Sequence, residues 1–355
     1  MHSIQNKSSF FLGPHLITSG GEPVFVAELG ICHGGALDVA LALAEAAIDA
    51  GAHCVKTESF QTEALVLDPT ATCSYTIRGK RVSTTLAEHM SRYELPLEAH
   101  RRICALCRDR DIPFMCTVHD TAAVDFLVQA GASALKIASP DIVHFPLLKH
   151  VASTGLPVFL DTGSALSDEV ERAVEALRQA GQQGIVVNHN PAGHPAPASG
   201  HHFRMMQELG RSLDVPTGLS DHFEGCEMLP LAVAMGASVL EKPVTFDNTV
   251  PEPERNWAVN IQDIPHVLGL LRRAYASLGV ATRTLDENQI AYRDQNRVAC
   301  VAARNLAAGE LMTLETVTFG RPRKGIGVEH WDKVEGLRLR VPKQKYEFLQ
   351  WSDIS

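Results

Sequence analysis

Short apolar runs rich in β-branched residues alternate along the chain with segments whose apolar residues recur every three or four positions. In the first of these segments, Leu37, Leu41, Ala44 and Ile48 fall on one face of a helix. The runs predicted to form strands are Val24–Glu28, Cys54–Lys56, Phe114–Thr117, Ala134–Ile137, Val158–Leu160, Ile185–Asn188, Thr217–Leu219 and Val239–Glu241. This succession of strand and helix is typical of parallel α/β folds.

Three of the units share a further pattern. Gly-Ala precedes the strand, and Lys56, Lys136 or Lys242 stands at or just after the end of the apolar run. Glycine readily ends a helix, and the apolar run suits a buried strand. Eight units over about 240 residues predict a closed (β/α)₈ barrel (TIM barrel), whose chemistry lies at the C-terminal strand ends. An open doubly wound sheet is disfavoured, because no G-x-G-x-x-G follows the first strand.

Three stretches depart from this alternation. The segment from Glu58 to Arg92 is longer than an ordinary loop and contains a hairpin-like stretch at 75–82, so we expect a lid or rim there. The stretch 281–297 is polar and turn-prone. The tail that follows it, 297–355, contains short apolar runs. We therefore expect a barrel domain over 1–280, a linker over 281–296 and a small β-rich domain over 297–355.

The composition favours small-molecule chemistry. The 355 residues carry a formal net charge of −9, and the Lys and Arg residues are not clustered as nucleic-acid binding requires, so we expect no nucleic-acid partner. No apolar run approaches the roughly 18 residues that span a membrane. The N-terminus also lacks the layout of a signal peptide, so we expect a soluble cytoplasmic protein without a membrane partner. The eight scattered cysteines fit reduced, packed thiols.

Ionisable and hydroxyl side chains gather at the predicted C-terminal strand ends, which a barrel brings to one mouth. They are Glu28, Lys56, Glu58, Thr117, His119, Lys136, Ser139, Asp141, Asp161, Thr162, His189, Ser220, Asp221, His222, Glu241 and Lys242. Converging lysines can bind a phosphate or carboxylate, or one of them can form a Schiff base. The histidines between 189 and 222 also indicate a divalent metal, although no compact metal-binding signature appears.

Several motifs, in order along the chain, resemble the sialic acid synthase family. They are VAELGICHGG at 26–35, VKTESF at 55–60, LKIAS at 135–139, GLSDH at 218–222 and EKPVTFD at 241–247. The tail, with Gly309-Glu310, Arg321-Pro322, Gly325-Ile326-Gly327 and a closing WSDI, is similar to that family's C-terminal antifreeze-like (SAF) domain. The resemblance implies a (β/α)₈ barrel followed by this domain, in a homodimer whose C-terminal domains are swapped so that each closes the partner's barrel.

The reaction implied by the resemblance condenses phosphoenolpyruvate with the open-chain aldehyde of an N-acylated amino sugar, giving a nonulosonic acid and phosphate. A divalent metal, Mn²⁺ or Mg²⁺, polarises the aldehyde in that reaction. The residues that would hold the phosphate and carboxylate are Lys56, Thr117, Lys136, Ser139 and Ser220. Glu28 would act near the aldehyde carbon, and His222 would serve catalysis as a metal ligand. Asp141 and Glu254 would meet sugar hydroxyls, and Arg321 would reach the acyl group from the neighbouring cap.

The chain departs from the family pattern within this same pocket. Pro243 stands where the family has its second metal-ligand histidine and cannot coordinate, so the two-histidine site cannot form as the family builds it. Asp161 replaces a phosphate-binding serine and would repel a phosphate, and Glu58 adds another carboxylate. Ala192 and His194 replace a substrate-contacting asparagine and tyrosine. The residues available for a substitute metal shell are His222, His189, His194, Asp161 and Glu58.

Three functional hypotheses follow. The favoured one is a sialic-acid-synthase-like transferase that uses phosphoenolpyruvate and an aldehyde, because the resemblance accounts for the whole chain. The second is an aldolase or lyase that acts on a 2-keto acid through a Schiff base on Lys136 or Lys242. The third is a non-catalytic sugar-binding paralogue, since the altered residues cluster in the pocket while the scaffold pattern survives.

Overall fold

A computed structural model describes residues 9–77, 80–191 and 193–355. The chain divides into two compact units, the first ending at Gly279 and the second spanning Val280–Ser355. The first unit contains the predicted strand-and-helix repeats, and the second contains the β-rich tail. In the described part of the chain, no helix combines the length and apolarity needed to cross a membrane.

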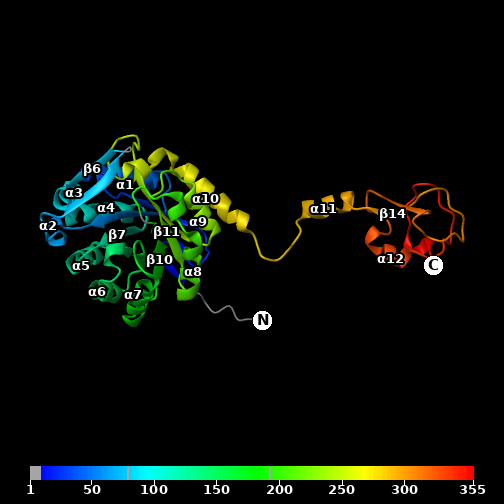
Figure 1. Ribbon diagram of the computed structural model, residues 1–355, viewed down its shortest axis with the longest axis horizontal. Helices are drawn as coiled ribbons and strands as arrows, with labels where there is room; N and C mark the ends of the chain where they lie inside the picture. Colours follow the sequence, from blue (N-terminus) through cyan, green and yellow to red (C-terminus); the bar gives the residue numbers. More distant parts are fainter. Residues whose placement is uncertain (1–8, 78–79, 192) are drawn as a thin grey trace. The chain divides into compact units, whose positions relative to one another are not determined.

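Eight parallel strands close into a barrel in the first unit (Figure 1). They are β3 (Val24–Glu28), β4 (Cys54–Ser59), β7 (Phe114–Val118), β8 (Ala134–Ile137), β9 (Val158–Asp161), β10 (Ile185–His189), β11 (Thr217–Ser220) and β12 (Val239–Thr245). Each strand pairs with the next along this series, and β12 pairs with both β11 and β3. The predicted (β/α)₈ fold is confirmed. Most strands extend beyond the predicted ends, because polar side chains there remain within the sheet.

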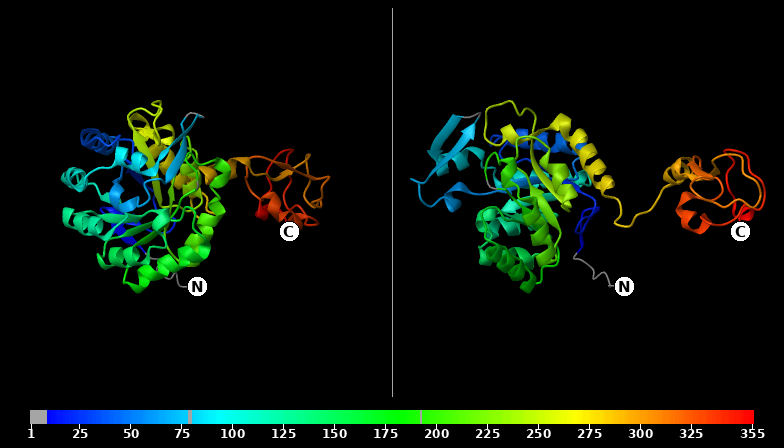
Figure 2. Two further views of the ribbon diagram at one scale, coloured as in Figure 1. Left: turned by 60° about the vertical axis from the view of Figure 1, so that its left-hand side comes forward. Right: turned by 45° about the vertical axis from the view of Figure 1, so that its right-hand side comes forward.

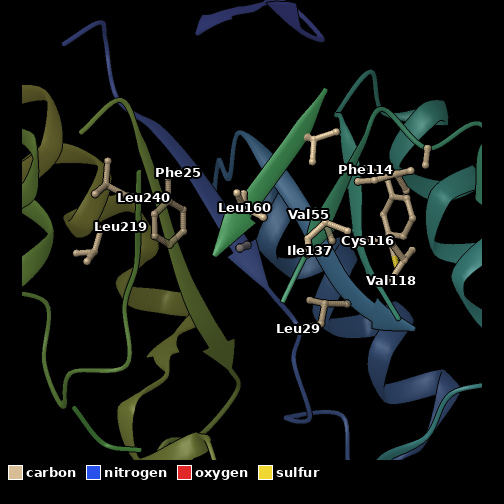
Figure 3. Packing of buried hydrophobic residues seen from close by; sticks show 14 of the residues in the cluster. Phe25, Leu29, Val55, Phe114, Cys116, Val118, Ile137, Leu160, Leu219 and Leu240 are labelled. Atoms are coloured by element: carbon tan, nitrogen blue, oxygen red, sulfur yellow. The ribbon is translucent and has the colours of Figure 1, made fainter. Parts of the chain in front are cut away.

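Helices cover the outside of the barrel (Figure 2). They are α1 (Leu37–Asp49), α4 (Leu97–Asp109), α5 (Thr121–Ala130), α6 (Phe145–Ser153), α7 (Ser167–Gln179), α8 (Phe203–Leu213), α9 (Met228–Ala234) and α10 (Ile264–Leu278). Alternate strand residues such as Phe25, Leu219 and Leu240 face this helical layer and belong to the largest apolar cluster (Figure 3). The opposite phase of each strand therefore points into the barrel.

A short hairpin closes the N-terminal end of the barrel. Its strands, β1 (Phe10–Leu12) and β2 (His15–Ile17), pair antiparallel. Leu12 and Ile17 are fully buried in one cluster with the inward residues at the strand starts, among them Phe159. The sequence analysis did not predict this hairpin. Because it fills one end of the barrel with apolar side chains, the polar strand ends at the other end face the only unplugged mouth among the described residues.

The long segment after β4 forms a rim. It contains α2 (Thr62–Leu65), the antiparallel pair β5 (Thr72–Ile77) and β6 (Lys80–Thr85), and α3 (Leu86–Tyr93). Thr85 begins α3 with a capping box to Glu88. At the end of α3, the Tyr93 hydroxyl donates to Glu252, which lies in the loop after β12. The expected hairpin is present, although Arg78 and Gly79 at its turn lie outside the described residues.

The second unit has a small core of its own. It contains α11 (Glu287–Asn296), β14 (Ala299–Ala302), β15 (Val317–Gly320) and α12 (Trp331–Val334). Cys300, Met312, Ile326 and Leu349 are buried together within it. Helix α11 lies inside the stretch 281–296 that we expected to be a linker. Its start signal is the capping box of Asp286 with Gln289, a pattern that the sequence analysis overlooked.

Candidate active site

One inward residue from each barrel strand contributes to a buried polar layer at the C-terminal end. The layer consists of Glu28, Lys56, Thr117, Lys136, Asp161, Asn188, Ser220 and Glu241. Each of these residues is at most 5 % exposed. The residues two positions earlier on seven of the strands form the apolar cluster inside the barrel, with Phe159 and Met115 among them. The period of two in a strand therefore places a charged layer directly above an apolar floor.

Ion pairs connect this layer, and Glu241 lies at their centre. Glu241 Oε1 contacts Lys56 Nζ at 2.9 Å and Lys136 Nζ at 2.5 Å. Lys56 Nζ also contacts the Glu28 carboxylate, and Lys136 Nζ lies 2.8 Å from Asp161 Oδ2. Three carboxylates thus surround two ammonium groups. Such buried charges are tolerable only because each one has partners.

The network shifts the pKa values of its members in opposite directions. Burial raises the pKa of Glu28 to about 7, although the Lys56 ammonium opposes the shift. Burial also acts against the charge of Glu241, but the two lysines outweigh it and hold the pKa of Glu241 well below its usual range. Around neutral pH, Glu28 therefore exists in both protonation states, as a group that transfers protons requires.

Several buried polar atoms around the layer have no hydrogen-bond partner. They are Thr117 Oγ1, Asn188 Oδ1, Glu241 Oε2, His222 Nδ1 and Trp257 Nε1. Buried polar groups in folded proteins are nearly always satisfied, so a group of unsatisfied atoms calls for a missing partner such as a ligand or water. Their concentration at the barrel mouth indicates a place for a polar ligand.

The next inward position on β4 and β7 adds a second charged cluster. His119 Nδ1 lies 2.6 Å from Asp141 Oδ2, and His119 Nε2 lies 3.1 Å from Glu58 Oε1. Burial disfavours the charged ring, but the two carboxylates outweigh it and raise the pKa of His119 to about 10. Glu58 and Asp141 are thereby fixed in place by a shared imidazolium, and their remaining oxygens can accept hydrogen bonds from ligand hydroxyls.

Glu254 enters the site from the loop after β12. Its Oε2 accepts a hydrogen bond from the Ile31 backbone N–H at 2.5 Å. A Cβ on Gly30 would lie 2.0 Å from the same oxygen, and Gly30 has a φ of +46°, so only glycine permits this approach. Burial, and then the nearby Glu28 carboxylate, raise the pKa of Glu254 to about 8.

The donor set does not fit the metal site that the resemblance implies. His222 and Pro243 each lie two positions beyond the pair Ser220–Glu241 of β11 and β12, but Pro243 has no donor atom. The His222 ring instead lies 4.5 Å from the His194 ring, centre to centre. Across residues 9–77, 80–191 and 193–355, no three His, Cys, Asp or Glu side chains are grouped to hold a metal ion. A metal ion at this mouth therefore stays a prediction.

The remaining candidates fall partly outside the mouth. Ser139 begins a single 3₁₀ turn after β8, and its Oγ would lie 2.3 Å from a Cβ on Gly163. Lys242 lies on the opposite face of β12 from Glu241, where its Nζ contacts Asp221 Oδ2 at 2.7 Å. Our expectation that Lys242 points into the mouth was therefore wrong.

Two further candidates cannot be placed at the mouth. Arg321 belongs to the second unit, where Nη1 donates to Asn296 Oδ1 at 3.4 Å, so its predicted role stays a prediction. Ala192 lies outside the described residues.

Two residues of the layer were missed or undervalued by sequence reasoning. Glu241 was noted only as a strand-end residue, and Asn188 was passed over in favour of His189. His189 is buried on the other phase of β10, where its Nε2 contacts the His201 carbonyl. Counting in steps of two from the apolar floor residue Val186 would have selected Asn188.

The closed barrel with its buried charged layer defines a class of protein, a (β/α)₈ barrel whose ionisable side chains gather at the C-terminal strand ends, where such barrels carry their chemistry. The model of the NeuB family matches residues 43–283, and the SAF domain model matches residues 297–355. The first match covers more than half of the chain, so this protein belongs to the NeuB family and ends in a SAF domain. The resemblance to sialic acid synthases is thereby confirmed.

Relatives with assigned names match nearly the whole chain. The N,N'-diacetyllegionaminic acid synthase of Legionella pneumophila is 30% identical over 333 residues, which cover 93% of this chain and 94% of that protein. The N-acetylneuraminate-9-phosphate synthase of Homo sapiens is 26% identical and covers 93% and 92%. Among solved structures, the N-acetylneuraminic acid synthetase of Leptospira borgpetersenii, in complex with citrate, has a TM-score of 0.72 at 25% identity and covers 81% and 96%.

Replacing Glu254 by Gln should remove a pH-dependent loss of stability. The pKa of Glu254 is about 8 in the folded protein against 4.5 ordinarily, so its contribution to stability is complete below pH 4.5 and is lost as the pH rises through 8. Glutamine resembles the protonated carboxyl and keeps an acceptor for the Ile31 N–H. Between pH 6 and pH 9 the wild type should lose about 2–3 kcal/mol of its free energy of unfolding through this group, and Glu254→Gln should lack that loss when urea unfolding is compared at the two pH values. Equal pH slopes in the two proteins would contradict this.

Replacing Pro243 by His should create the two-histidine metal site that the resemblance implies. The new imidazole would stand beside His222, and two neutral imidazoles are good ligands for Mn²⁺ or Zn²⁺. Titration calorimetry with Mn²⁺ should show a saturable site in Pro243→His but not in the wild type, in Pro243→Ala or in Pro243→His combined with His222→Ala. A wild-type Mn²⁺ site that disappears in His222→Ala would refute this account of the mouth.

Proposed function

We propose that this protein condenses phosphoenolpyruvate with the aldehyde of an open-chain amino sugar or a related aldehyde. The methylene carbon of phosphoenolpyruvate forms a bond to the aldehyde carbon, whose oxygen takes up a proton. Water then adds to the cationic carbon left on the donor and loses a proton, which leaves a hydroxyl and a phosphate on the same carbon. The carbon–oxygen bond to phosphate then breaks, while the hydroxyl gives its proton to the leaving phosphate and becomes the 2-keto oxygen. The products are a 2-keto-3-deoxy acid, of the nonulosonic acid class when the sugar has six carbons, and inorganic phosphate.

The observation that carries this proposal is the buried polar layer with its two lysines and its unsatisfied atoms. Phosphoenolpyruvate carries a carboxylate and a phosphate, so its binding needs several cationic and hydroxyl groups in one enclosed place. One layer of the barrel supplies these groups, which are Lys56, Lys136, Thr117 and Ser220. The legionaminic acid synthase relative, 30% identical across both domains, supports the same reaction class. A likeness of fold alone would not support it, because barrels of this kind serve many reactions.

The donor would bind with its carboxylate and phosphate on the two ammonium groups. Thr117 Oγ1 has no partner within the protein, so it can donate to one of the anionic oxygens without breaking a bond. Ser220 Oγ accepts from Lys136 at 3.2 Å and donates to Glu241 Oε1 at 3.2 Å, so it would have to turn its proton away from Glu241 to donate to a ligand. Ser139, which lies against Gly163, would close the phosphate side.

Glu28 would serve two of the proton transfers of the reaction. Its pKa of about 7 lets it give a proton to the aldehyde oxygen and take one from the attacking water. The unpartnered Nδ1 of His222 lies at the same mouth and would hydrogen-bond the substrate. Asp141 and Glu254 would accept hydrogen bonds from sugar hydroxyls, each held by a partner of its own, His119 and the Ile31 N–H.

A Schiff-base mechanism is less well supported. A lysine nucleophile must be a neutral amine. Burial opposes the charge on Lys56, but the Glu241 and Glu28 carboxylates outweigh it and raise its pKa well above the usual range. Lys136 contacts two carboxylates, and Lys242 faces away from the mouth against Asp221. These lysines are arranged as counter-ions rather than as nucleophiles.

We place the reaction in the cytoplasm. All eight cysteines are free, and six of them, including Cys54 and Cys116, are buried. Burial raises the pKa of Cys54 well above its usual range, so its thiol stays protonated and unreactive. Such unpaired thiols suit a reducing compartment.

The reaction is tested by phosphate release from purified protein given phosphoenolpyruvate and a panel of N-acylated amino-sugar aldehydes. Phosphate release should require both substrates. The Lys136→Ala variant should lose at least 100-fold in kcat/KM, because it lacks an ammonium group that would bind the anionic donor. Lys149→Ala, which removes an exposed lysine from α6, is the matched control and should retain activity. Near-normal turnover in Lys136→Ala would refute the site, and borohydride trapping of a 2-keto acid would favour the lyase instead.

We also propose a homodimer in which Arg321 of each SAF domain completes the partner's site, as the resemblance implies. If so, Lys136→Ala and Arg321→Ala should each be nearly inactive, yet co-expression should restore about a quarter of wild-type activity, since half the dimers are hybrids with one intact site. Sedimentation equilibrium would check the size of the assembly. A monomer, or hybrids without restored activity, would refute this arrangement.

A further inference from the structure

Three polar side chains of the protein surround the ammonium group of Lys136. Its Nζ lies 2.8 Å from Asp161 Oδ2, 2.5 Å from Glu241 Oε1 and 3.2 Å from Ser220 Oγ. The contacts with Glu241 and Ser220 are hydrogen bonds, and the contact with Asp161 is an ion pair. An anionic ligand that binds Lys136 must therefore compete with these three partners.

Asp161 and Glu241 differ in what they would lose by giving way. Asp161 also accepts hydrogen bonds from Asn188 Nδ2 at 3.2 Å, through Oδ1, and from Asn190 Nδ2 at 2.9 Å, through Oδ2. Each of its oxygens therefore keeps an amide donor after Lys136 departs. Glu241 has all of its partners on Oε1, while its Oε2 is buried without any. Without Lys136, Glu241 would keep Lys56 and Ser220 but would lose a charge-assisted hydrogen bond of 2.5 Å. Asp161 would lose an ion-pair contact of 2.8 Å, so losing Lys136 costs Asp161 less.

The negative charge of Asp161 should weaken the binding of phosphate at Lys136. Glu28, Asp161 and Glu241 already supply three carboxyl groups to the ammonium groups of Lys56 and Lys136. A phosphate adds about two further negative charges in a buried place, where like charges repel strongly. Asp161 lies on the same ammonium that the phosphate would use, so its charge opposes the phosphate directly.

We propose that Asp161 is a built-in competitor for Lys136, which holds the lysine in the free protein, moves aside for the phosphate of the donor and recaptures the lysine when product phosphate leaves. The proposal rests on the proposed function and adds a specificity-determining residue to it. Asp161 lowers the affinity for phosphate in both donor and product. It thereby favours phosphate release at the cost of a higher KM for the donor.

Asp161→Asn isolates this effect, because asparagine keeps the size of the side chain and removes its charge. Calorimetric titration with inorganic phosphate, and separately with phosphoenolpyruvate, should show at least tenfold tighter binding than in the wild type. In turnover, KM for phosphoenolpyruvate should fall and product inhibition by phosphate should rise. Misfolding or general damage would weaken binding, so a gain in affinity separates this role from a structural one. Asp161→Ser is the second variant and should show the same gain.

Glu58→Gln provides the matched control. It removes a carboxylate from the same mouth, but Glu58 contacts His119 rather than Lys136. The phosphate affinity of the Glu58→Gln protein should differ from that of the wild type by less than about threefold, because the removed carboxylate is paired with His119 and not with Lys136. An equal gain in Glu58→Gln would show a general charge effect and overturn the proposal. Unchanged or weaker phosphate binding in both Asp161 variants would also overturn it.

The experiments distinguish a wrong competitor role for Asp161 from a wrong reaction. If no aldehyde supports phosphate release but Asp161→Asn binds phosphate more tightly, the reaction is wrong and the competitor role stands. If turnover occurs without any gain in the Asp161 variants, the reaction stands and the competitor role is wrong. Absence of phosphate and phosphoenolpyruvate binding in every variant would overturn the competitor role.

Discussion

The pairing of Glu241 with two buried lysines is the interaction on which the mouth of the barrel depends. Lys56, Lys136 and Glu241 are each at most 3 % exposed, and an unpaired charge in such a place would be strongly destabilising. The three residues come from β4, β8 and β12, which meet only because the sheet closes on itself. Closure of the barrel and neutralisation of its interior therefore depend on each other.

This constraint explains why chemistry is confined to one end. The hairpin carrying Leu12 and Ile17 seals the other end with apolar side chains, and the layer containing Phe159 forms a dry floor beneath the charges. Electrostatic interactions above that floor are stronger than in water, which benefits both the network and an anionic substrate. The same enclosure raises the pKa of Glu28 to about 7, so one physical cause supports both binding and proton transfer.

The altered positions form a coherent set when viewed as charge pairs. Asp161 supplies a carboxylate to Lys136, and Glu58 shares His119 with Asp141. Pro243, on β12, has no side-chain donor atom for a metal ion. Internal ion pairs therefore hold these carboxylates in the same mouth as the two lysines and Glu28. Ligand binding here is a competition with the protein's own carboxylates, whereas an open cationic pocket would simply attract the anion.

Periodicity and helix signals in the sequence determined the barrel, its strand order and the residues at the strand ends, because local patterns of two and of three to four residues are properties of the chain itself. Tertiary structure decided which of two neighbouring residues faces the mouth. Glu241 and Asn188 face inward, while Lys242 and His189 do not, since the phase of each strand is fixed by packing against the helices. Only the closed fold brings Asp161 to Lys136 and Glu58 to His119, because such contacts join residues that are distant in the chain.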